Sequence, residues 1–303
     1  MRSEFFAAAA IILFCASASF SQETESNVHA EKPASEERSF SFEAQQKVIV
    51  GSHHYQNTDT FVDLGLPKGF GINADFNAFR NDTSSWTPTI TFGVGRTWNN
   101  LALAGTYAVS PLTDDTRSTA FDASASVKTD SENFATTVGG DILVTHNSQY
   151  LRFPKVTAEV DITQRTPTII IKQQIYKTRL DAAFSQYTYN KNIPLIAAAL
   201  NGKKLNRFSN FTGGLSGLIQ GFPDHSEKFG ARQELGPATL WASYGSIHFL
   251  DTALQLHATS DTEQYGVDFD LPKDFSTTLQ YQHVRQTGQQ GSDQYGLAIS
   301  WSL

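Results

Sequence analysis

The stretch at residues 268–286 reads DFDLPKDFSTTLQYQHVRQ, and a similar stretch, DLGLPKGFGINADFNAFR, occupies residues 63–80. The two align on Pro272 and Pro67, and in each the proline stands between a leucine and a lysine. Proline fixes φ and cannot continue a central strand, so each Pro-Lys pair predicts a tight turn between two strands. A looser third copy lies at residues 153–165. The repetition indicates a sheet built from successive hairpins.

Alternation of apolar and polar residues supports this prediction. It is clearest in FDASASVK (121–128), VTAEVDIT (156–163) and QYGVDFDL (264–271). Side chains along a strand point alternately to opposite faces, so each segment has one apolar and one polar face. Alternation alone fits either a soluble β-sandwich or a barrel whose apolar face meets lipid. Many segments run to ~9–12 residues, the length of a tilted membrane strand, which favours the barrel.

The last nine residues, YGLAISWSL, carry the most specific signal. Their apolar set alternates to the final residue: Tyr295, Leu297, Ile299, Trp301 and Leu303. This ending resembles the terminal strand of Gram-negative outer-membrane β-barrel proteins of the porin-like kind, which the barrel assembly machinery recognises. Members of this class usually end in Phe or Trp, so Leu303 departs from the pattern. The resemblance implies an integral outer-membrane protein in contact with outer-membrane lipid and lipopolysaccharide.

The expected fold is therefore all-β, a closed antiparallel transmembrane barrel of about 16 strands, with 12–18 compatible with the sequence. Short periplasmic turns would include Pro67, Lys68, Pro272 and Lys273, and the outer loops would be longer. One loop, NIPLIAAALNGKKL (192–205), predicts a short helix, since a proline suits its first turn and Gly-Lys-Lys suits its end.

The chain divides into three expected parts. Residues 1–21 have a short charged start, an apolar run and small residues before a cleavage point, which predicts a signal peptide. Residues 22–39 are polar and aperiodic, so a disordered periplasmic segment is expected there. Residues 40–303 form the barrel. Because Cys15 is the single cysteine, the mature chain would hold no disulfide.

Composition excludes several functions. The 303 residues carry a net charge of −7 and form no basic stripe, which argues against nucleic-acid binding. His53 and His54 are adjacent, and neighbours on a strand face opposite sides, so they make a poor metal site. We expect no metal, no cofactor and no enzymatic activity.

The predicted function is a pore for small hydrophilic solutes or ions. Charged residues on the polar faces would line its lumen and bias ion passage: Asp75, Asp122, Lys128, Glu159, Asp161, Asp268 and Asp270. Two alternatives stay open. His146 and Ser148 have a spacing similar to that in outer-membrane phospholipase A and the lipid A deacylases, where a histidine activates a serine to hydrolyse lipid. The other alternative is a non-conducting barrel with a surface or structural role.

Overall fold

The computed structural model describes residues 40–81, 84–113, 116–131, 134–152, 157–193, 222–251, 257–288 and 290–302. The predicted signal peptide, the predicted disordered segment, nearly all of the predicted loop helix and Leu303 lie outside the described residues. The strands are β1 Ser41–Gly51, β2 Gln56–Leu66, β3 Phe70–Asn81, β4 Ser84–Trp98, β5 Leu101–Thr113, β6 Thr116–Ser131, β7 Phe134–Arg152, β8 Thr157–Ile175, β9 Thr178–Gln186, β10 Thr188–Tyr189, β11 Pro223–Leu235, β12 Ala238–Phe249, β13 Thr259–Leu271, β14 Phe275–Gln286 and β15 Ser292–Ser302.

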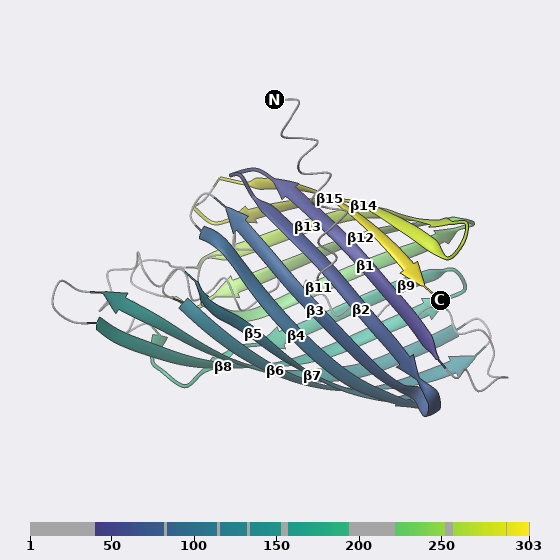
Figure 1. Cartoon of the computed structure of the whole chain (residues 1–303), viewed down its shortest axis with the longest axis horizontal. Helices are drawn as coiled ribbons and strands as arrows, with labels where there is room; N and C mark the ends of the chain where they lie inside the picture. The colour runs from purple at the N-terminus through teal and green to yellow at the C-terminus, as the bar shows by residue number, and fades with distance from the viewer. Residues whose placement is uncertain are drawn as a thin grey trace.

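All 15 strands belong to one antiparallel sheet (Figure 1). Within the part of the chain that the structure describes, the short β10 pairs only with β8. The other strands pair with their neighbours along the chain, with β9 pairing to β11, and β1 pairs with β15. The two-residue β10 continues the line of β9 along β8, so 14 strands close the ring. The number lies within the range expected from the sequence. Closure leaves no unpaired sheet edge in the wall. Among the described residues, no helix is both long and apolar enough to cross a membrane.

The two ends of the barrel differ. At one end, called here the turn end, the connections are short, and the first and last strands begin and finish there. Pro67 and Lys68 lie in the 3-10 turn Pro67–Gly69 (η1) between β2 and β3, and Pro272 and Lys273 lie between β13 and β14. Lys68 and Lys273 adopt left-handed φ values of 65° and 67°, which allow the chain to reverse tightly. The other end, called the loop end, carries the longer connections.

The third Pro-Lys copy is not equivalent to the other two. Residues 153–156 connect β7 to β8 and lie outside the described residues. This connection is at the loop end, whereas the other two Pro-Lys pairs are at the turn end. The third Pro-Lys pair is therefore in a connection at the opposite end of the barrel from the other two.

Candidate functional site: the inner wall of the barrel

Strand periodicity and burial identify the face that points into the barrel. On β15, Tyr295, Leu297 and Ile299 are 58%, 48% and 51% exposed and point outward, whereas Gln294 and Ala298 between them are buried and point inward. Register then transfers this assignment around the ring, because directly paired residues share a face. The inner wall is mostly polar.

Five of the seven charges predicted to line the lumen occupy inward-facing positions. They are Asp75 on β3, Asp122 and Lys128 on β6, and Asp268 and Asp270 on β13. Inward acidic residues that were not expected from the sequence include Asp59, Asp63 and Asp181. They occupy alternate positions of their strands, so the sequence indicated that they share a face. Which face points into the barrel could be assigned only from the pairing of neighbouring strands.

The expectation that Glu159 and Asp161 line the lumen is wrong. The register of β7 with β8 runs without a shift over the whole length of both strands. Ile169 and Ile171 of β8 are 60% and 48% exposed on the outer face, and odd-numbered residues of one regular strand share a face. Glu159 and Asp161 therefore point outward, and Ile162, which is 1% exposed, points inward.

The reversal has a physical reason. Ile162 packs against Ile193 and Phe222 in an apolar cluster inside the loop end. On the outer face, the Nη2 of Arg117 lies 2.9 Å from Oε1 of Glu159. Here β7 and β8 extend past the apolar part of the outer surface, where water or lipid headgroups favour charged side chains. The alternation in VTAEVDIT is real, but its apolar side faces the interior.

Asp268 holds the inner wall together across four neighbouring strands. Its carboxylate accepts hydrogen bonds from Nε1 of Trp241 on β12 at 3.2 Å and from Oγ1 of Thr278 on β14 at 2.7 Å. Nη2 of Arg232 on β11 lies 3.4 Å from it. Charge-assisted hydrogen bonds of this kind are stronger than neutral ones. Asp268 is thus a circumferential brace as well as a lumen-facing charge.

A second braced region consists of neutral amides. Ser243 donates to Oε1 of Gln264 at 2.9 Å, and Nε2 of Gln264 donates to Oε1 of Gln282 at 2.8 Å. At the seam between the first and last strands, Nε2 of Gln45 donates to Oγ of Ser300 at 2.9 Å. The inner wall therefore presents amide and hydroxyl groups between its charges.

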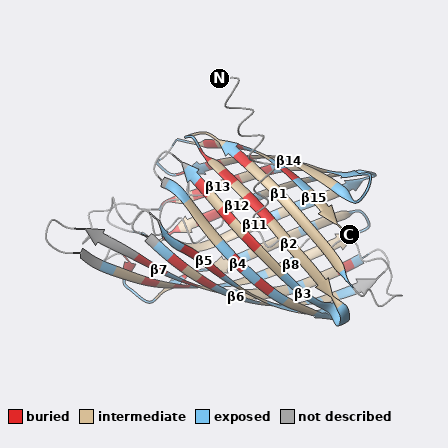
Figure 2. Cartoon of the chain, in the orientation of Figure 1, coloured by how far each residue is buried: buried red, intermediate tan, exposed pale blue. Residues whose placement is uncertain are grey.

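The two halves of the interior differ in packing, as the red segments in Figure 2 indicate. Towards the loop end the inward residues are buried, including Asn77 at 7% and Gln164 at 0% exposure. Apolar clusters also occur there, one of which contains Ile49, Tyr55 and Phe79. Towards the turn end, inward residues such as Ser126 and Lys128 are half-exposed. The lumen is therefore more open at the turn end.

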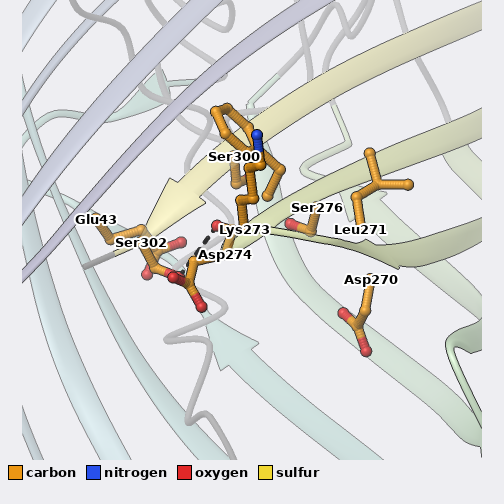
Figure 3. Close-up of a pocket in the computed structure, with 9 residues that line it drawn as sticks. Glu43, Asp270, Leu271, Lys273, Asp274, Ser276, Ser300 and Ser302 are labelled. Atoms are coloured by element: carbon orange, nitrogen blue, oxygen red, sulfur yellow. Dashed lines mark hydrogen bonds between the residues drawn. The ribbon is translucent and has the colours of Figure 1, made fainter.

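A shallow pocket lies at the turn end, beside the seam between β1 and β15 (Figure 3). Glu43, Asp270, Lys273 and Asp274 contribute charged groups of both signs to its lining. The backbone N–H of Ser302 donates to the carbonyl oxygen of Asp274 at 3.0 Å, which ties the last strand to the turn after β13. Asp270, one of the predicted lumen charges, therefore lies at the turn-end mouth.

His146 and Ser148 lie on the outer face of β7, near the loop end. The structure brings Asp161 of β8 to both: the hydroxyl of Ser148 donates to Oδ1 of Asp161 at 2.5 Å, and Nε2 of His146 is 3.8 Å from the same oxygen. Nδ1 of His146 is 3.1 Å from Oγ1 of Thr163. Ser148 therefore donates its hydrogen bond to the carboxylate and not to the histidine. It is also only 1% exposed.

No group of three or more His, Cys, Asp or Glu residues capable of holding a metal ion occurs within the described part of the chain. The predicted assembly signal occupies β15, where Tyr295, Leu297, Ile299 and Trp301 share the outer face. Leu303 lies outside the described residues.

The outer surface has the layered character of a membrane-spanning protein. An aliphatic band includes Ile169, Ile171, Leu279, Leu297 and Ile299. Near the turn end it is bordered by aromatic residues: Phe42 and Phe275 contact Trp301, and Phe70 and Trp98 contact Arg96. Towards the loop end lie Tyr265, Tyr281 and Tyr295 in a row, in which Tyr265 stacks on Tyr281 and the ring of Tyr295 is tilted against that of Tyr281. Aromatic girdles on either side of an apolar band mark the two interfaces of a bilayer.

A closed antiparallel ring with a lipid-facing band and a polar interior defines the class of outer-membrane β-barrel proteins. The chain is an integral protein of this class. The sequence matches no family model, and no curated protein is similar to it.

Solved structures similar to the chain are outer-membrane proteins. OpdK of Pseudomonas aeruginosa with vanillate has 10% identity and a TM-score of 0.42, covering 87% of this chain and 98% of its own. OpdQ of the same organism gives the same four values. A loop L8 deletion mutant of OmpT from Vibrio cholerae has 8% identity and a TM-score of 0.44, with coverage of 87% and 98%. At these values the similarities carry no argument about function, and the class assignment rests on the barrel itself.

Proposed function

We propose that this barrel forms a pore for passive diffusion of small hydrophilic solutes or ions across the outer membrane. The observation that supports it best is the polar, half-exposed inner wall in the turn-end half of a closed 14-strand ring. An 8-strand barrel is filled by its own side chains, whereas porins with 16–18 strands enclose water. With 14 strands and a densely packed loop-end half, a narrow pore is expected.

The charges of the inner wall favour cations. Among the described inward positions, acidic residues outnumber basic ones. The acidic set is Glu43, Asp59, Asp63, Asp75, Asp122, Asp141, Asp181, Glu234, Asp268 and Asp270, and the basic set is Lys47, Lys128, Lys172, Arg179, Lys228 and Arg232. Because salt screens such charges over ~10 Å at 0.1 M, the preference should be strongest at low salt.

Single-channel recording in planar bilayers tests the pore, and reversal potentials under a salt gradient test its selectivity. Asp122→Asn with Asp141→Asn removes two inward carboxylates from adjacent strands, and should reduce cation preference at pH 8. The matched control is Glu159→Gln with Asp161→Asn, which removes two carboxylates from the outer face. This control should leave the reversal potential unchanged. An absence of conductance in the parent protein would overturn the proposed pore and favour a non-conducting surface barrel.

A second candidate function is lipid hydrolysis at the outer face. It is favoured by one observation: Asp161 supplies, next to His146 and Ser148, the acidic partner that the sequence did not reveal. Hydrolysis would require Ser148 to turn from Asp161 to His146 and to become exposed to an acyl ester. Labelling by a fluorophosphonate that is lost in Ser148→Ala would support this function. Unlabelled parent protein would exclude it.

A further inference from the structure

The inner wall of the turn-end half contains a repeated pairing of glycine with a longer side chain. In four strand pairs an inward glycine stands directly opposite a larger inward residue of the next strand: Gly93 opposite Asn73, Gly230 opposite Asp181, Gly266 opposite Trp241, and Gly296 opposite Gln280. Three pairs lie in the turn-end half of their strands, on β3–β4, β9–β11 and β12–β13, and the pair of Gly296 with Gln280 lies near the middle of β14 and β15.

In each pair the longer side chain lies over the glycine. A Cβ atom built on any of these glycines would fall within 3.0 Å of the side chain opposite, closer than real Cβ contacts occur. At Gly266 the atoms met are those of the Trp241 indole, and at Gly296 they are Cγ and the amide of Gln280. An ordinary inward side chain stands away from the sheet. Here the missing Cβ leaves space for the neighbour to lie flat along the wall.

Small residues occupy many of the other inward positions in this half of the barrel. They include Ala102, Ala104, Ser124, Ser126, Ser276 and Ser300. The loop-end half contrasts with this, since large inward residues such as Phe79, Ile162 and Phe249 are buried there. The cross-section of the lumen is therefore determined by glycine pairing at one end and by packed side chains at the other.

We propose that the four glycine pairs keep the barrel open from mid-strand to the turn end as a wide vestibule, so that the size limit for solutes lies in the loop-end half. This inference rests on the proposed pore. It identifies four residues that determine the width of the lumen: Gly93, Gly230, Gly266 and Gly296. It also predicts that uncharged polymers enter further from the turn end than from the loop end.

The test uses Gly266→Val in the full chain. The new side chain displaces the Trp241 indole from the wall into the lumen, so conductance should fall. The size of polyethylene glycol that enters from the turn-end chamber should also fall, with no change from the loop-end chamber. Gly266→Val combined with Trp241→Ala should recover both quantities, because the displaced indole is gone. Gly105→Val, the same change on the outer face where no side chain lies against the glycine, should leave both unchanged.

A second, independent test compares Gly296→Val with the double variant Gly296→Val, Gln280→Ala. It replaces the first test if Gly266→Val does not fold. Heat-modifiable migration on gels verifies folding of each variant. If the parent conducts but the glycine variants have the same conductance and polymer entry, the proposed vestibule is wrong and the proposed pore is retained. If the parent does not conduct, the pore itself is wrong.

Discussion

Two adjacent residues of β8 allow the orientation of the barrel wall to be tested by one chemical change. Ile171 is 48% exposed on the outer face, and Ile170 beside it points inward. Arginine at either position introduces the same charge, volume and strand propensity. Only Ile171→Arg places the guanidinium against lipid.

The magnitude follows from position. The outward positions of β8 from Pro167 to Ile175 are apolar except for Gln173, and Ile171 is at the middle of this run. At a rise of ~3.3 Å per residue and a tilt of ~40°, it lies about 10 Å from either edge along the membrane normal. Arginine near the bilayer midplane costs ~2–4 kcal/mol, which is a change of about 30-fold to 1,000-fold in the folding equilibrium constant.

The assay is reversible folding into phospholipid vesicles, followed by urea titration and heat-modifiable migration. We expect Ile171→Arg to lose ~2–4 kcal/mol of folding free energy. Ile170→Arg should lose much less, because its guanidinium can reach water in the half-open part of the lumen. Equal losses in the two variants, or a larger loss in Ile170→Arg, would refute the assignment of the faces.

The hydrogen bonds and strand faces of the barrel wall lead to three further predictions. Asp268→Asn should lower the urea midpoint by weakening the brace to Arg232, and raising the salt concentration should diminish the difference from the parent; an unchanged midpoint would mean that the brace contributes nothing. Removing residues 292–303 should abolish recovery in outer-membrane fractions, because β15 closes the ring and carries the proposed signal for the assembly machinery; normal recovery would contradict both roles. Ser148→Ala should leave conductance as in the parent, since Ser148 is on the outer face, and an altered conductance would place it in the conduction path.

Much of the architecture was readable from the sequence because a strand repeats every two residues. Alternation in β13 and β15 predicted two-faced strands, and the prolines at 67 and 272 predicted the tight turns where they occur. Aromatic and aliphatic residues at alternate positions near the C-terminus indicated a lipid-facing strand, and that face is exposed as expected. These are local properties, so they need no knowledge of which strands are neighbours.

What the tertiary structure decided is which face points where, and which residues meet. The period of two in residues 156–163 specifies two faces but not their direction, and the continuous pairing of β8 with β7 reversed the expected one. Closure at 14 strands depends on β1 pairing with β15, at opposite ends of the chain, and on β9 pairing with β11 across the long connection between them. The four contacts of glycine with a longer side chain likewise exist only through register. A glycine in the sequence marks a missing side chain, and only its neighbour across the sheet determines what fills the space.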